Sequence, residues 1–122
     1  MTKSIEAIIN VCKETLLNTK ANLLNRVREN HAEYNSQERG GDEADLAVHV
    51  LAEDQFLRTQ DRLRSQLLDI EIALAKISKG EYGICEETEE PIEVERLLAI
   101  PWTRLSVEGA EIREELSKRY AK

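Results

Sequence analysis

Two adjacent glycines, Gly40 and Gly41, separate two long stretches of helical pattern and constrain the fold more than any other feature. The first stretch covers residues 4 to about 38, and the second covers residues 45 to about 78. Glycine adopts positive φ without a Cβ clash, so the chain can reverse direction between the stretches. Two helices joined by a short loop run antiparallel. We therefore expect a mainly α protein built on a helical hairpin roughly 45–50 Å long, because a helix rises about 1.5 Å per residue, with its tip at residues 39–47.

Apolar residues in both stretches recur at alternating spacings of three and four, which is the pattern of a coiled-coil seam. In the first stretch the seam residues are Ile5, Ile9, Cys12 and Leu16. In the second stretch they are Leu67, Ile70, Leu74 and Ile77. Nearer the tip the seam positions of the second stretch are polar, at Glu53 and Gln60. We expect a hairpin that is firmest at its base and looser toward its tip.

The composition suits long solvated helices better than a thick globular core, since 34% of the 122 residues are charged and 4% are aromatic. The formal net charge of −7 disfavours direct binding of DNA or RNA, which draws its affinity from Lys and Arg on phosphates. An acidic chain can still bind a protein partner. The chain lacks a run of about eighteen apolar residues and a signal-peptide pattern, so we expect a cytoplasmic protein without membrane contact.

Two carboxylates, Asp42 and Asp45, lie at the predicted tip. Asp42 can cap the N-terminus of the second helix, and the helix dipole favours Asp45 in the first turn. A tip at the end of a long arm can also present both carboxylates to a partner. The spacing of the residues leaves both interpretations open.

Gly80 and the basic residues before it predict the end of the second helix. The pattern from 81 to 105 is irregular, and the alternation of Ile92 and Val94 suggests a short strand. A last helix is predicted from about 107 to 120, with its apolar stripe packed back on the base of the hairpin. The predicted domains are therefore a coiled-coil hairpin at 1–79 and a small segment with a C-terminal helix at 80–122.

The run Gly80-Glu81-Tyr82-Gly83-Ile84-Cys85-Glu86 resembles the start of the zinc-finger region of the DksA/TraR family of bacterial transcription regulators. The resemblance continues downstream through Ile92, Arg96, Leu97, Ala99, Pro101, Leu105 and the run from Glu111 to Glu114. Upstream, the segment 42–47 resembles the D-x-x-D-x-A motif at the tip of the family's coiled coil. The resemblance covers the chain from the tip to about residue 115, whereas the first helix matches only in being helical.

The chain departs from the family at the zinc ligands. In the family these are four cysteines, arranged as two C-x2-C motifs. The corresponding positions here are Cys85, Thr88, Ser106 and Gly109. One thiolate, two hydroxyl groups and a glycine cannot make a structural zinc site. We expect a degenerate finger without metal or other cofactor, similar to the family's zinc-independent members, which are linked to stress. Cys85 is expected to pack as a small hydrophobe, beside a substitute core of Pro91, Ile92, Trp102 and Leu105.

The resemblance implies a non-enzymatic regulator that binds RNA polymerase rather than DNA. In the family the coiled coil enters the secondary channel of the polymerase and its tip alters the stability of promoter complexes. Asp42 and Asp45 would then interact near the active site, and Ala47 would keep the tip slim. The globular end and the last helix would contact the channel rim.

The resemblance makes a response to the alarmone (p)ppGpp uncertain, with weak or absent binding expected. Positions that carry basic side chains in alarmone-binding members correspond here to Asp69, Ile100 and Ala110, and a polyanion needs Arg or Lys. Arg96, Arg104 and Arg113 are candidates for partial compensation.

Two other functions remain open. An acidic hairpin tip also occurs in transcript-cleavage factors, where carboxylates hold a second Mg²⁺. A plain helical-hairpin adaptor is the other alternative. A stand-alone enzyme is the weakest candidate, since the sequence offers no nucleophile–base pair, phosphate-binding loop or metal cluster.

Overall fold

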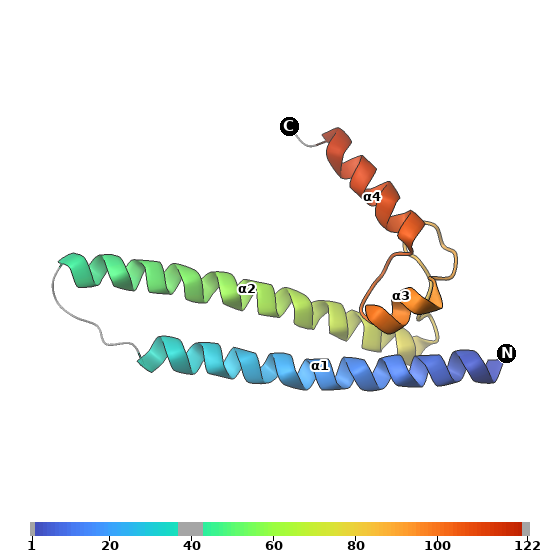
Figure 1. The fold of residues 1–122 in the computed structure, drawn as a ribbon, viewed down its shortest axis with the longest axis horizontal. Helices are drawn as coiled ribbons and strands as arrows, with labels where there is room; N and C mark the ends of the chain where they lie inside the picture. Colours follow the sequence, from blue (N-terminus) through green and yellow to red (C-terminus); the bar gives the residue numbers. More distant parts are fainter. Residues whose placement is uncertain (1, 37–42, 121–122) are drawn as a thin grey trace. The chain divides into compact units, whose positions relative to one another are not determined.

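The computed structural model describes residues 2–36 and 43–120, with side chains described for 5–36 and 46–120. Four helices follow one another along the chain, α1 (Thr2–Ser36), α2 (Glu43–Lys79), α3 (Val94–Ala99) and α4 (Val107–Tyr120) (Figure 1). Within the described residues the only β pairing is an isolated antiparallel bridge between Ile84 and Pro91. The predicted mainly helical fold, with a hairpin of two long helices and a C-terminal helix, is confirmed.

Three local details differ from, or refine, the sequence predictions. α1 begins at Thr2, two residues before the predicted start of the first helical stretch at residue 4. The predicted strand at 92–94 is wrong, because Val94 begins α3 and Glu93 is its N-cap residue. The last helix has the bounds that the sequence predicts, 107–120.

Packing groups the chain into two compact units, a base unit of residues 1–18 and 69–122 and a tip unit of residues 19–68. In the base unit α2 ends at Lys79, and the next residue, Gly80, has φ +75°. The Gly80 N–H donates to Ile77 O at 3.2 Å, and the Glu81 N–H donates to Lys76 O at 2.9 Å. These two bonds form a Schellman motif that satisfies the last carbonyls of the helix. The chain is thereby turned out of the helix into the loop that precedes α3.

The core of the base unit joins α1, the loop after α2, and α3. Its buried cluster is Cys12, Cys85, Ile92 and Leu97, against which Ile8, Tyr82 and Leu105 pack. Two of the four residues predicted for the substitute core lie outside it, since Pro91 is exposed and Trp102 is 36% exposed. Cys12 from α1 and Leu97 from α3 occupy the core instead. The first helix therefore supplies part of the core of the segment at 80–122. The sequence pattern of that segment alone does not indicate this contribution.

The tip unit pairs the end of α1 with the first part of α2. Its buried residues are Leu23, Leu63 and the polar Gln60. Six large apolar side chains of α2 are exposed here, namely Leu46, Val48, Val50, Leu51, Leu57 and Leu68. The described helices include none that is long and apolar enough to span a membrane. The tip unit thus pairs its helices over a narrow seam and leaves much apolar surface uncovered.

Candidate functional site

The predicted tip site belongs to the tip unit. Asp42 lies outside the described residues, and Asp45 belongs to the first turn of α2, although its side chain is outside the described part. Ala47 is exposed near the start of the same helix. The role of these three residues therefore stays a prediction at the level of individual contacts.

A hydrogen-bonded polar layer connects the two helices of the tip unit farther from the turn. Asn30 of α1 donates through Nδ2 to the backbone carbonyl of Phe56 at 3.3 Å and to Oε1 of Gln60 at 3.1 Å. Gln60 Nε2 lies 2.9 Å from His31 Nε2. Gln60 is 8% exposed, and a buried amide of this kind has to be hydrogen-bonded. The layer satisfies that requirement across the seam.

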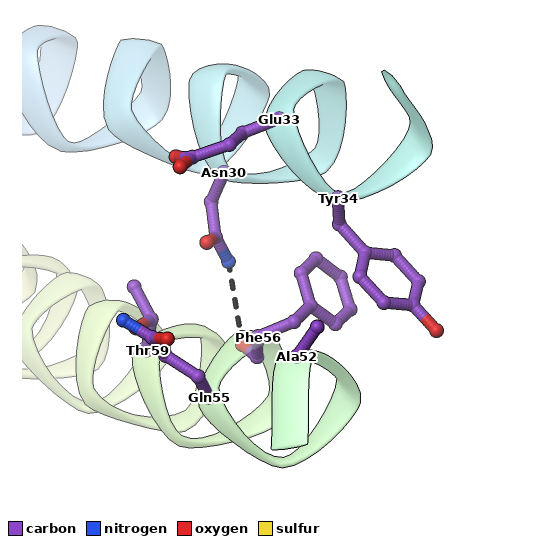
Figure 2. A pocket seen from close by; sticks show the side chains of 7 residues that line it. All are labelled: Asn30, Glu33, Tyr34, Ala52, Gln55, Phe56 and Thr59. Carbon is purple, nitrogen blue, oxygen red and sulfur yellow. Dashed lines mark hydrogen bonds between the residues drawn. The ribbon is translucent and has the colours of Figure 1, made fainter. Parts of the chain in front are cut away.

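An aromatic stack and a small cavity lie beside the polar layer. The Tyr34 and Phe56 rings stack with centroids 4.5 Å apart, and the His31 ring meets Phe56 edge-on at 5.0 Å. Figure 2 shows the Tyr34 ring of α1 next to the Phe56 ring of α2, with the Asn30 hydrogen bond beside them. The cavity has a volume of about 170 Å³ and is lined by Asn30, Glu33, Tyr34, Ala52, Gln55, Phe56 and Thr59. The sequence predicts a polar seam at Gln60, but the partners on α1 cannot be assigned without the pairing of the helices.

The four positions of the degenerate finger come together in the base unit around the Cys85 sulfur. Cys85 is 1% exposed, which confirms that it is buried. The Thr88 N–H points at Cys85 Sγ from 3.5 Å. A Cβ added to Gly109 would overlap the same sulfur atom. The thiol of Cys85 therefore fills space that any larger residue at position 109 would need.

Ser106, at another of these positions, starts α4. Its Oγ accepts a hydrogen bond from the Gly109 N–H at 3.0 Å, as expected of an N-cap serine. The Glu93 carboxylate accepts from the Val107 N–H, with its two oxygens at 3.2 and 3.3 Å. Both contacts satisfy backbone N–H groups that the first turn of a helix leaves without intrahelical partners. A position that the family resemblance matches to a zinc ligand thus serves here as a helix cap.

The surroundings of Cys85 change its acidity in two opposing ways. Burial raises the pKa of the thiol, whereas hydrogen bonds from the side chains and backbone of Ser106 and Thr88 lower it, and the net pKa is about 6. Hydrogen bonds to the charged form of a group favour that form. Cys85 therefore packs like a hydrophobe, as predicted, but also carries a polarised sulfur that the prediction does not include.

The residues of the degenerate finger do not fit a zinc ion. A structural zinc site uses four thiolate or imidazole ligands in a tetrahedron, and only Cys85 can supply one. The Thr88 hydroxyl accepts from the Glu90 N–H at 3.3 Å, and the Ser106 hydroxyl is the cap of α4. Across residues 5–36 and 46–120, no group of three or more His, Cys, Asp or Glu is placed to hold a metal ion. The donor set at the finger is therefore that of a hydrogen-bonded core.

Four basic side chains of the base unit, those of Lys76, Arg96, Arg104 and Arg113, are engaged with acidic or carbonyl partners. Arg104 pairs with Asp69 at 3.1 Å, and Arg96 Nε donates to Leu105 O at 2.8 Å. Arg113 lies 3.1 Å from a Glu87 oxygen and 3.6 Å from a Glu86 oxygen. Lys76 meets Glu86 at 2.7 Å, and this hydrogen bond holds the pKa of the Glu86 carboxyl below its usual range. The three arginines that could compensate for a missing anion site are thus already paired.

The C-terminal helix α4 is buried only at its start. Gly109 is buried, whereas residues 111–120 are all exposed, so the predicted packing of the apolar stripe on the hairpin is wrong. The stripe consists of Ile112, Leu116 and Tyr120, spaced four residues apart on one face. Isolated helices of this length are marginal in water. The exposed stripe is a candidate surface for a protein partner.

Two comparisons with known sequences agree with this architecture. The prokaryotic dksA/traR C4-type zinc finger matches residues 80–115. The RNA polymerase-binding transcription factor DksA of Caulobacter vibrioides (strain NA1000 / CB15N) is 38% identical over 109 residues, which cover 89% of this chain and 67% of that protein. A protein of Aquifex aeolicus (strain VF5) is 36% identical over 120 residues, covering 93% of this chain and 81% of the relative.

Solved structures of similar shape extend the agreement to the hairpin. Transcription factor DksA2 from Pseudomonas aeruginosa matches with a TM-score of 0.82 and 36% identity, over 94% of this chain and 88% of that chain. Dks from Chlamydia trachomatis L2 (LGV434), an RNA polymerase binding protein and transcriptional regulator, matches with a TM-score of 0.52 and 25% identity over 96% of this chain and 95% of that one. The similarity therefore covers the helical hairpin as well as the finger-like segment.

Proposed function

Because this chain belongs to the DksA/TraR family, we propose that it is a transcription regulator that binds RNA polymerase through the secondary channel. The observation that carries the proposal is the match to Pseudomonas aeruginosa DksA2 over 94% of the chain with a TM-score of 0.82. The Caulobacter relative that is an RNA polymerase-binding factor supports the choice of partner. The net charge of −7 fits a protein partner better than a nucleic acid.

In this proposal the tip of the hairpin and the C-terminal helix α4 contact different parts of the polymerase. The tip, with Asp42, Asp45 and Ala47, acts near the polymerase active site and changes the lifetime of promoter complexes. The apolar stripe of α4 contacts the rim of the channel. Its support is the run of exposed residues at 111–120, which carries apolar side chains without cover from the described chain. Burial of such a stripe on a partner is favourable in proportion to the apolar area removed from water.

The proposed regulator works without zinc and without chemistry of its own. One thiolate among the four finger positions supports independence from zinc, and catalysis by the polymerase needs no group from this chain. Binding of (p)ppGpp at the family position is disfavoured, because Asp69 stands there and pairs with Arg104. A paired arginine offers a polyanion little unless the ion pair is broken first.

The proposal is tested with RNA polymerase, a promoter and tip variants of the full chain. The wild-type protein is expected to bind core polymerase and to alter promoter-complex lifetime. Asp45→Asn and Ala47→Thr are expected to bind equally well but to lose the effect on lifetime, because the rim contacts lie outside the tip. Asp54→Asn is the matched control, since Asp54 is an exposed carboxylate of the same helix, paired with Arg58 at 3.0 Å. It is expected to retain full effect.

Other outcomes favour the two alternatives. Full effect of Asp45→Asn would reduce Asp45 to a helix-dipole contact, worth roughly 0.3–1 kcal/mol of helix stability. Stimulated cleavage of transcripts in stalled complexes, dependent on Asp42 and Asp45, would indicate a cleavage factor. Failure of the wild-type chain to bind polymerase would leave a helical-hairpin adaptor.

A further inference from the structure

We infer that the polar layer of Asn30, His31 and Gln60 fixes the axial register of α1 against α2 in the tip unit and so positions the tip. The positioning of the tip for transcription rests on the proposed function, whereas the fixing of the register does not. Asn30, His31 and Gln60 are therefore assigned as positioning residues.

The first step is that only one assignment of hydrogen-bond donors and acceptors satisfies the polar layer. The Phe56 carbonyl can only accept, so the Asn30 atom at 3.3 Å from it must be the amide nitrogen. The Gln60 atom 3.1 Å from that nitrogen must then be the carbonyl oxygen. The Gln60 nitrogen is left to donate to His31 Nε2 at 2.9 Å. Each bond fixes the orientation of the next.

The second step is that such a layer tolerates one stagger of the helices. A slip by one residue moves a side chain by about 1.5 Å along the axis and turns it by about 100°. Hydrogen bonds weaken steeply when the angle at the donor hydrogen falls below about 120°. Apolar side chains lack this directionality, and buried polar groups at coiled-coil seams specify register in known cases.

The third step is that the described part of the seam closer to the tip than Gln60 holds no buried side chain. Among the described residues, no side chain of 24–36 or of 46–59 is buried. The Tyr34–Phe56 stack, with centroids 4.5 Å apart, adds contact area beside the layer. The polar layer therefore lies where the buried seam ends, on the side of the segment that carries Asp45 and Ala47.

The cavity beside the layer makes a clean substitution possible. It has a volume of about 170 Å³ and includes Asn30 in its lining. Asn30→Leu with Gln60→Leu replaces the half-buried Asn30 amide and the buried Gln60 amide by apolar groups, and the side chain at position 30 borders this space. Replacing a buried polar network by apolar residues of similar volume is often neutral or stabilising. We expect the double variant to melt no lower than wild type while its helices lose their unique register.

Register is measured by the distribution of distances between spin labels at Asn35 and Leu51, two exposed residues of the tip unit on α1 and α2. Labels carried on unnatural amino acids leave Cys12 and Cys85 intact. The wild-type chain is expected to give one narrow distribution, and Asn30→Leu/Gln60→Leu a broad or doubled one. An unchanged narrow distribution in a folded double variant would overturn the inference.

Two substitutions at His31 keep the test decisive if the double variant does not fold. His31→Gln offers an oxygen acceptor to Gln60 and is expected to keep the narrow distribution. His31→Leu offers no acceptor and is expected to broaden the distance distribution. Both changes are made at the same exposed position. Equal distributions for the two variants would also overturn the inference, since a merely structural role would respond to size rather than to the acceptor.

The consequence for transcription is read from the same variants. His31→Leu is expected to bind RNA polymerase like wild type but to lose most of the effect on promoter-complex lifetime, and His31→Gln to keep it. A broadened distribution with full transcriptional effect would overturn the positioning of the tip and leave the register fixing intact. Failure of wild-type binding would overturn the proposed function, while the spin-label result would still stand.

Discussion

The base unit and the tip unit use the same two helices but hold them together in different ways. In the base unit the contact is apolar and closed, with Leu16 fully buried and Ile70 and Cys12 at 1% exposure. In the tip unit the seam narrows to Leu23 and Leu63 and then passes into hydrogen bonds at Gln60. Apolar burial supplies stability without direction, whereas hydrogen bonds supply direction with little net stability. The base is built to stay folded, and the tip is built to hold one geometry.

This contrast indicates which part of the molecule opens locally at the lower cost in free energy. Segments that act on partners are commonly drawn from the less stable parts of a protein, where few buried contacts oppose local opening. The exposed apolar side chains of the first turns of α2 belong to such a segment. The base unit carries the opposite features, a closed core and ion pairs between α2 and the finger-like loop.

The strongest way to break the contrast is to truncate a buried leucine of the base unit and an exposed apolar side chain of the tip unit. Leu16→Ala is expected to lower the free energy of unfolding by about 2–5 kcal/mol, because a fully buried leucine leaves a cavity. Val50→Ala, at a position 58% exposed in the tip unit, is expected to change it by less than about 0.5 kcal/mol. Urea denaturation measures both. Comparable losses for the two variants would contradict the division into a firm base and a thin tip seam.

The second prediction concerns the collapsed finger at the centre of the base unit. Gly109→Ala is expected to cost about 1–3 kcal/mol, because the added Cβ overlaps the Cys85 sulfur and overpacks the core. Adding Cys85→Ala should recover much of the loss, and the double-mutant cycle measures the coupling. Additive losses from the two changes would show that the sulfur and the glycine do not share the space.

Gly80→Ala is a useful control for this cycle. Gly80 has φ +75° with no atom near an added Cβ, so its substitution tests backbone strain without overpacking. Its cost should be independent of the residue at position 85. Coupling between positions 80 and 85 would mean that the cycle reports a general loosening of the base unit.

The third prediction sharpens the contrast through pH. The pKa of Cys85 is lowered to about 6 in the folded chain, whereas an unfolded cysteine titrates near about 8.5. The folded state therefore binds this proton less readily, and its stability rises between about pH 6 and pH 8.5 and is lost as the pH falls through about 6. Melting temperatures across this range should show the rise in wild type and a smaller one in Cys85→Ala. Equal slopes would show that the thiol stays protonated.

The smallest expected effect is that of chelation. Because three of the four finger positions lack a thiolate, EDTA should leave the melting temperature unchanged, and purified protein should contain far less than one zinc per chain. Elemental analysis and thermal melting measure these quantities. Stoichiometric zinc, or unfolding with EDTA, would contradict the metal-free base unit.

Much of the fold follows from local rules that the sequence states openly. Apolar spacing predicts two long helices, and Gly80 predicts the end of the second, where the structure has a Schellman motif. The residues of α4 also follow from periodicity. These features depend on contacts within a few residues, so no knowledge of the tertiary pairing is needed.

The remainder depends on contacts that are distant in sequence. Cys12 of α1 lies in the core of the base unit. Trp102, the largest apolar side chain of the segment at 80–122, stays 36% exposed. Ser106 caps α4, a role hidden by its alignment with a metal ligand. The Asn30–Gln60 bond needs the stagger of two helices, which periodicity alone does not determine.

The mutual fit of Cys85 and Gly109 also bears on the evolutionary reversibility of this design. A site with four cysteine ligands requires cysteine at positions 88, 106 and 109 in addition to Cys85. No single one of these substitutions completes the site. Cysteine at 109 collides with the Cys85 sulfur, and cysteine at 106 removes the cap of α4. A single substitution to cysteine at position 106 or 109 is therefore expected to destabilise the base unit before a metal site is complete.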